Sequence, residues 1–240
     1  MGNWIKQVST PKRLFLAWQA PDHLDDRFRW AVGNLSVNAK DLDLAYLANL
    51  EFERMNQGKS FLQLEHLGYQ GYPGYRLGQL HKNFLSTLMR RLPPRNRSDF
   101  VEYKRQFRIP QYLTLSEVEL LAITEAKLPS DGFSVVDPLD PEAESCDLLL
   151  EVAGFRYYAS ELLNIKLGDP LALVPEPDNE YDPDAIMIRI GERRIGYVNR
   201  LQAATMGRWL KNRRVSAYVE RLNGKGNKPR AFLFIRVRPS

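Results

Sequence analysis

Apolar and polar residues alternate along the chain in short blocks, and the first blocks predict strands. The segments RLFLAWQ (13–19) and FRWAVGNLSV (28–37) are rich in aromatic and β-branched residues and flank a polar turn, so each predicts a strand. The next segment, LDLAYLANLEFERMN (42–56), fits both a strand and a helix. Its pattern leaves both structures open.

Three tyrosines are evenly spaced in LGYQGYPGYRLGQLH (67–81), which is rich in glycine and therefore predicts a loop. One interpretation is that Tyr69, Tyr72 and Tyr75 stack on nucleic-acid bases, with Arg76 beside them. The other is that they pack over the loop, and we favour this second interpretation.

Three helices are expected next, over NFLSTLMRR (83–91), SDFVEYKRQF (98–107) and TLSEVELLAITEAK (114–127). In the last of them, Thr114 and Glu117 have the spacing of a capping box, in which two side chains bond the first free N–H groups of a helix. Its apolar residues also recur at helical spacing.

The following segment, LPSDGFSVVDPLDPEAES (128–145), carries three prolines and several turn formers, so it predicts a domain boundary. We expect a small α+β domain over residues 1–140, whose role the pattern does not indicate. A second domain is expected over residues 147–240.

The second half of the chain predicts mostly strands. The strand segments are 147–155, 169–177, 185–190, 193–198, 215–222 and 230–237. One amphipathic helix is expected over residues 201–214, and the NGKGNKP segment (223–229) predicts the turn of a terminal hairpin. Five or six short strands with one main helix predict a small β-barrel of the OB or SH3 type. The whole chain is thus expected to be α+β.

Composition narrows the class of protein. With 44% hydrophobic and 26% charged residues, the chain is typical of a folded, water-soluble protein. No apolar run approaches the roughly 20 residues of a membrane helix, and the N-terminal residues lack the apolar core of a secretory signal. Cys146 is the only cysteine, so no internal disulfide can form. We therefore expect a cytoplasmic protein that binds no membrane.

Charge is unevenly distributed along the chain. Residues 147–188 contain 2 basic and 9 acidic residues, whereas residues 189–240 contain 14 basic and 2 acidic ones. The basic quarter fits a polyanionic partner. It equally fits a solvated basic face of a folded domain.

An acidic turn precedes the strand expected at 185–190. Its acids are Glu176, Asp178, Glu180, Asp182 and Asp184. A calcium loop that starts at Asp178 would need glycine at its sixth position and glutamate at its twelfth, where Pro183 and Arg189 stand. One cysteine and three scattered histidines do not make a zinc site. No metal or other cofactor is expected, and we expect most of these acids to be solvated in a structural turn.

A metal-dependent nuclease remains one interpretation of the turn. Asp182 and Asp184 precede the strand and Glu192 follows it, and such enzymes hold magnesium with carboxylates. The residues after Glu192 are arginines, however, and arginine is a poor substitute for the lysine of those centres. The second half contains no histidine, which excludes a catalytic triad there. We expect no catalytic residues and no enzyme.

Several motifs in the second half together resemble the HIRAN domain. They are VAGFRYY (152–158), GDPLALVPEPDNEYDPDAI (168–186), IGYVNR (195–200) and PRAFLFIRV (229–237). Their order and spacing agree with that family. The first half is similar to the region that precedes HIRAN in some bacterial proteins, through LFLAWQ and the W-x-V-G-x-L pattern of Trp30–Leu35.

The resemblance implies a fold and a function. HIRAN domains are small β-barrels that accompany helicase-like, fork-remodelling ATPases or, in bacteria, stand without one. Eukaryotic HIRAN domains bind single-stranded DNA and grip its 3′ end. The implied protein is a non-catalytic DNA-binding module of DNA repair or replication-fork processing. Its implied partners are single-stranded DNA and a helicase or other repair protein.

The resemblance also implies a site. Arg156 would contact a phosphate, Tyr157 would stack on the terminal base, and Tyr181 would line the pocket. Asp182 would accept a hydrogen bond from the 3′-hydroxyl, since a carboxylate repels phosphate and rejects a 3′-phosphate. The remaining implied site residues are Tyr158, Asn179, Tyr197 and Arg200.

Structural interpretations of these residues stay open. Tyr158 and Tyr197 fit the core of a barrel, and Arg156 and Asp182 fit an ion pair with each other. A DNA binder without end selectivity, a protein-interaction module and the nuclease remain alternative functions.

Overall fold

The computed structural model describes residues 2–24, 26, 28–38, 41–128, 130–159, 165–224 and 229–240. The chain divides into two compact units that are interleaved along the sequence. The N-terminal unit comprises Thr10–Phe100 and Leu115–Pro138. The C-terminal unit comprises Met1–Ser9, Val101–Thr114 and Leu139–Ser240. Two segments of the domain expected over residues 1–140 thus group with the C-terminal unit.

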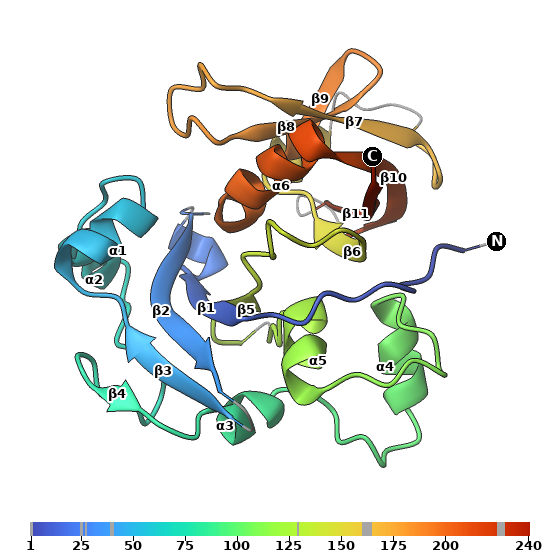
Figure 1. The fold of residues 1–240 in the computed structure, drawn as a ribbon. Helices are drawn as coiled ribbons and strands as arrows, with labels where there is room; N and C mark the ends of the chain where they lie inside the picture. The colour runs from blue at the N-terminus through green and yellow to red at the C-terminus, as the bar shows by residue number, and fades with distance from the viewer. Residues whose placement is uncertain are drawn as a thin grey trace. The chain divides into compact units, whose positions relative to one another are not determined.

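An antiparallel sheet forms the centre of the N-terminal unit (Figure 1). Its strand order is β4-β3-β2-β1-β5. The strands are β1 (Arg13–Gln19), β2 (Arg29–Val37), β3 (Leu42–Tyr46), β4 (Leu80–His81) and β5 (Phe133–Val136). β5 lies inside the expected domain boundary and pairs with β1, Leu16 opposite Val135. All four residues of β5 are buried, so the boundary prediction overlooked a short apolar run that completes this sheet.

Short helices accompany this sheet. They are η1 (Asp22–Leu24), α1 (Asn49–Met55), α2 (Phe61–His66), α3 (Leu85–Met89) and α5 (Glu117–Thr124). The ambiguous segment 42–56 forms a strand and then a helix. The capping box of α5 is made by Ser116 and Glu119 and not by the expected Thr114 and Glu117. The prediction was wrong because the helix begins two residues later than the TLSEVE pattern suggested.

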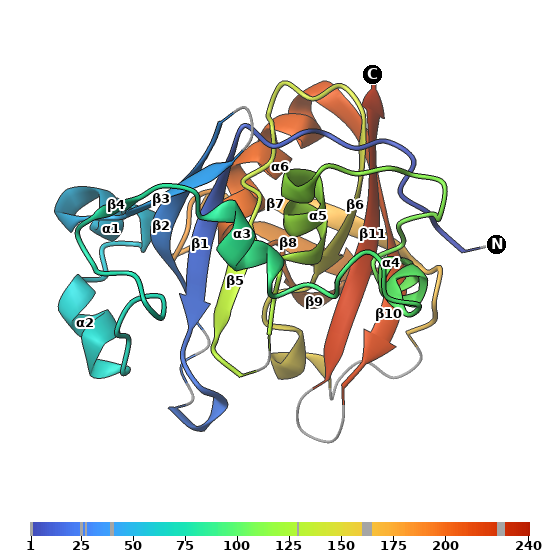
Figure 2. The ribbon, with the colours of Figure 1, turned by 90° about the horizontal axis from the view of Figure 1, so that it is seen from below.

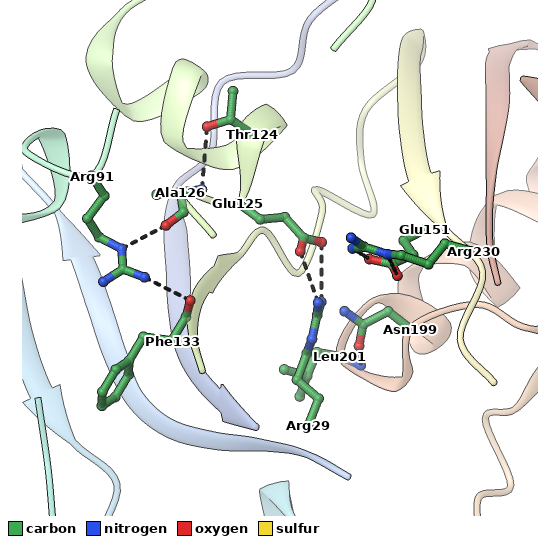
Figure 3. A network of polar contacts seen from close by, with 10 residues as sticks. All are labelled: Arg29, Arg91, Thr124, Glu125, Ala126, Phe133, Glu151, Asn199, Leu201 and Arg230. Carbon is green, nitrogen blue, oxygen red and sulfur yellow. Dashed lines mark hydrogen bonds and ion pairs between the residues drawn. The ribbon is translucent and has the colours of Figure 1, made fainter. Parts of the chain in front are cut away.

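The tyrosine-rich loop (67–81) packs within the N-terminal unit, to which it belongs. Tyr69 and Tyr72 are buried, at 4% and 7% exposure, and the Tyr72 ring contacts Phe133 at a centroid distance of 4.9 Å. Arg91 pairs with both oxygens of Asp131. It also donates to the carbonyl oxygens of Ala126 and Phe133 (Figure 3). The buried rings favour packing over base stacking for this loop.

The C-terminal unit holds a six-stranded antiparallel sheet, ordered β6-β11-β10-β7-β8-β9. The strands are β6 (Cys146–Glu151), β7 (Pro170–Pro175), β8 (Ile186–Ile190), β9 (Arg193–Tyr197), β10 (Arg213–Asn223) and β11 (Arg230–Pro239). Its helices are α4 (Phe100–Gln106), η2 (Phe155–Tyr157) and α6 (Arg200–Asn212). Each expected strand segment corresponds to one strand, although β6, β10 and β11 extend one or two residues beyond the expected bounds, and the α+β fold class is confirmed. Residues 225–228 of the expected hairpin turn lie outside the described residues.

An isolated β-bridge connects the two outer strands of this sheet, β6 and β9. Ala153, just after β6, exchanges hydrogen bonds of 2.8 and 2.9 Å with Tyr197 of β9. Gly196 makes this approach possible at φ +143°, because a Cβ there would overlap Ala153 O and stand 2.5 Å from Val152 Cγ1. The bridge brings η2 to β9. α6 lies next to β8 (Figure 1), and Met206 of α6 belongs to the same buried core cluster as Ile186 and Ile188 of β8.

Residues from the chain's N-terminus complete the C-terminal unit. The buried Asp147 carboxylate accepts from the backbone N–H groups of Lys6 (2.8 Å) and Gln7 (3.0 Å). Arg238 donates to the other oxygen of the same carboxylate, at 2.6 Å. Ile5 is fully buried. Figure 2 shows α4 next to the β10–β11 hairpin, where Arg221 donates to Gln106 O. These contacts explain why both early segments belong to this unit.

Candidate functional site

The acidic turn between β7 and β8 is held together by its own side chains. The Asn179 side-chain oxygen accepts from the backbone N–H groups of Tyr181 (3.0 Å) and Asp182 (3.1 Å). Asp182 Oδ1 accepts from Asp184 N at 2.9 Å. Asn and Asp favour turns for this reason. Asp178, Glu180 and Asp184 are exposed, so the solvated interpretation is confirmed for them.

Glu176 differs from the other acids of the turn because it connects the turn to β9. Its Oε2 accepts from the Tyr197 hydroxyl and from Asn179 Nδ2, each at 3.0 Å. Its Oε1 pairs with Arg194 Nη2 at 3.2 Å. One half-buried carboxylate therefore holds three side chains of the turn and the neighbouring strand.

Arg194 lies over two tyrosine rings. Its guanidinium carbon is 5.4 Å from the Tyr197 ring centroid and 6.0 Å from that of Tyr158. A hydrogen bond with Tyr158 raises the pKa of Arg194, so the cation persists at every physiological pH. Burial, and then the bond to Glu176, raise the pKa of Tyr197 to about 12. Tyr197 is therefore a neutral hydrogen-bond donor at neutral pH.

The η2 segment presents a second cation and tyrosine pair. Gly154 begins it in the left-handed region, at φ +75°, and Phe155 anchors it in the core. Arg156 Nη2 donates to the Tyr157 hydroxyl at 2.6 Å, and its guanidinium carbon lies 4.6 Å from the Tyr157 ring centroid. The Tyr157 side chain is 59% exposed. An exposed aromatic face next to a cation is a suitable surface for a flat ring.

The predicted site residues fall into three groups. Tyr158, Asn179 and Tyr197 are linked through Glu176 and Arg194, and Asp182 joins them through the Asn179 turn. Arg156 and Tyr157 form their own pair on η2. Tyr181 joins the turn through its backbone N–H, which donates to Asn179, while its side chain is 76% exposed. Arg200 is the first residue of α6.

The alternative interpretations placed Tyr158 and Tyr197 in the barrel core and paired Arg156 with Asp182. Tyr158 and Tyr197 are only half-buried, so neither belongs to the fully buried core. Among the described residues, Asp182 has no ion-pair partner, and this carboxylate is half-buried. Asp182 is therefore not paired with Arg156.

Neither Glu176 nor Arg194 was expected in the site. Glu176 stood among five similar acids, and Arg194 was considered only as a poor substitute for a nuclease lysine. The available signal was that Arg194 and Arg193 alternate along β9, so that one of them faces the turn. Within the described ranges, no three His, Cys, Asp or Glu side chains group closely enough to hold a metal ion. No described helix combines the length and apolar character that a membrane crossing requires.

Comparisons with known proteins concern the C-terminal unit. The family model described as HIRAN domain matches residues 147–237. The crystal structure of the HIRAN domain of human HLTF is 22% identical, over 40% of this chain and 80% of that chain, with a TM-score of 0.32. No curated protein matches the chain. The match to the family model identifies residues 147–237 as a HIRAN domain, as their motifs predicted.

Proposed function

We propose that the C-terminal unit is a non-catalytic module that binds single-stranded DNA. The observation that carries this proposal is the exposed Tyr157 ring with the Arg156 guanidinium beside it. Arg194 connects the neighbouring Tyr158 to Glu176, at the start of the turn that exposes Tyr181. Single strands bind where aromatic faces stack on bases and cations contact the backbone. The excess of basic over acidic residues among positions 189–240, 14 against 2, adds affinity that does not depend on sequence.

We further propose that the site prefers a 3′-hydroxyl end. Asp182 supports this, because its half-buried carboxylate has no ion-pair partner among the described residues. A carboxylate accepts a hydrogen bond from a hydroxyl and repels a phosphate. Tyr157 would then stack on the last base, with Arg156 at the adjacent phosphate.

In the cell, we place the protein in DNA repair or replication-fork processing in the bacterial cytoplasm. A non-catalytic module would act there by recruiting another protein to the DNA. Its protein partner would be a helicase or another repair enzyme, which the C-terminal unit brings to a strand end.

The Asp182→Asn variant tests the end preference. Asparagine keeps the side-chain oxygen that accepts from Asp184 N, so the turn is retained while the charge is lost. We expect the ratio of affinities for a 3′-hydroxyl and a 3′-phosphate strand to fall about tenfold, the size of one hydrogen bond to a charged group, with a smaller fall in overall affinity. Fluorescence anisotropy with end-labelled strands measures both.

The control is Asp178→Asn, the same charge change at an exposed position of the same turn. It should leave the affinity ratio unchanged. Equal loss of affinity for both ends in Asp182→Asn would remove Asp182 from end recognition.

A further inference from the structure

A network behind the proposed DNA site ties together residues that lie far apart in the sequence. Glu176 directly follows β7, Arg194 lies on β9 and Tyr158 comes just after η2. The Glu176 side chain is 21% exposed and that of Arg194 43%. Their ion pair lies against Tyr197 and Tyr158, two of the implied site residues.

We infer that Glu176 and Arg194 are positioning residues of this site, which fix the rings of Tyr158 and Tyr197 and the Asn179 turn before a DNA strand binds. The inference rests on the proposed function. It assigns a role to two residues that are not among the site residues implied by the HIRAN resemblance.

The contacts of Arg194 favour a role as a positioning residue over a direct contact with a phosphate. Its Nη2 is paired with Glu176, its Nε donates to Met187 Sδ at 3.2 Å, and its guanidinium carbon lies 6.0 Å from the Tyr158 ring centroid. A guanidinium has five N–H donors in a fixed plane, so these bonds set its orientation. Its charge is already balanced by Glu176. A phosphate that approached Arg194 would compete with this carboxylate for the same cation.

Glu176 also determines what Tyr197 offers to a ligand. The Tyr197 hydroxyl donates its only hydrogen to Glu176, so toward a ligand it can act only as an acceptor or through its ring. A ring held in one orientation binds a base without losing rotamer freedom on binding. That loss otherwise costs roughly twofold to tenfold in affinity per side chain.

The Arg194→Ala variant separates positioning from direct contact. We expect affinity for a short single strand to fall about tenfold, as two ring contacts and one ion pair are lost. The dependence of log affinity on log salt should stay as in the wild type. If Arg194 contacted a phosphate directly, its removal would instead reduce the magnitude of this slope by about 0.7. That result would overturn the positioning role.

Arg193→Ala is the matched control, since Arg193 is exposed on the same strand and carries the same charge. It should lower affinity less than threefold, about the effect of one exposed charge. If Arg194→Ala and Arg193→Ala weaken binding equally, the loss is one of charge alone and the inference is wrong.

Glu176→Gln tests the coupling between the Glu176 carboxylate and the Tyr197 hydroxyl. Glutamine can still accept from the Tyr197 hydroxyl, but its charge is gone. The pKa of Tyr197 should therefore fall from about 12 toward its ordinary value. Carbon-13 NMR of labelled tyrosine measures this titration, with Tyr197→Phe assigning the signal. An unchanged Tyr197 pKa would contradict the coupling.

The double variant completes the test. If Glu176 and Arg194 act as one unit, Glu176→Gln with Arg194→Ala should bind no more weakly than Arg194→Ala alone. Additive losses would overturn the inference. Should Tyr157→Ala weaken binding while both single variants bind like the wild type, the inference fails and the proposed function stands. A wild-type chain that binds no single strand overturns both.

Discussion

At the residue scale, Tyr197 gives the site a response to alkaline pH. Its pKa in the folded chain is raised to about 12, mainly by burial and by the bond to Glu176, whereas the pKa of an unfolded tyrosine is about 10. Below about pH 10 both states keep the proton, and the stabilisation is complete. Between about pH 10 and 12 the unfolded state loses its proton first, so this stabilisation is lost as the pH rises.

Urea unfolding between pH 9 and 12 checks this prediction. The wild type should lose more stability over that range than Tyr197→Phe, which has no proton to lose at this position. Below pH 9, the unfolding free energies of the two proteins should change with pH by the same amount. Equal losses for both proteins between pH 10 and 12 would contradict the shifted pKa.

The site residues show which features a sequence pattern can predict. Asn179 and Asp182 bond backbone groups two or three positions away, and such local bonds follow from residue type. Glu176 and Arg194 are 18 positions apart. Their pairing depends on the register of β7, β8 and β9, and composition did not distinguish Glu176 from its acidic neighbours.

At the element scale, Gly196 determines how β9 meets the residue after β6. At φ +143° and with Ala153 O against it, this position has no room for a Cβ. Gly196→Ala should destabilise the C-terminal unit by roughly 2–4 kcal/mol, from backbone strain and overpacking together. Urea unfolding measures the loss.

Gly207→Ala in α6 is the control for this substitution. A Cβ at Gly207 would meet Ile186 Cδ1 at 3.7 Å, an ordinary contact. Because alanine favours helix, this variant should be as stable as the wild type or more stable. If both alanine variants had the same stability, the bridge between Ala153 and Tyr197 would not need a glycine.

The elements predicted best are those whose own residues show a clear apolar pattern. The six strands and α6 of the C-terminal unit follow from apolar alternation and helical spacing. β5 was overlooked because its four residues stand among prolines and turn formers, and only pairing with β1 shows that they form a strand. The capping box was misplaced because TLSEVE offers two cap residues, Thr114 and Ser116, at a spacing of two.

At the scale of the whole molecule, the interleaving of the two units makes the HIRAN domain depend on the chain's N-terminus. Ile5 is fully buried in the C-terminal unit. Ile5→Ala should lower the opening free energy of that unit by about 2–5 kcal/mol, as for other large-to-small core substitutions. Native-state hydrogen exchange of the β6 and β11 amides measures the change.

Lys6→Ala is the control, because Lys6 is exposed and bonds Asp147 only through its backbone. Its effect should stay within about 0.5 kcal/mol. Full protection of β6 and β11 in Ile5→Ala would show that the N-terminal segment is not part of this fold. No local pattern in residues 1–9 predicted this packing, since the partners of Ile5 and Lys6 lie about 100 and 140 positions away.

The most direct test of the central claim is the binding of a short labelled single strand to the wild-type chain, by fluorescence anisotropy at two salt concentrations. The strand carries either a 3′-hydroxyl or a 3′-phosphate. We predict binding that weakens as salt is added and that favours the hydroxyl end. No binding of either strand at the lower salt concentration would contradict the DNA-binding function, and equal binding of both strands would contradict the end preference.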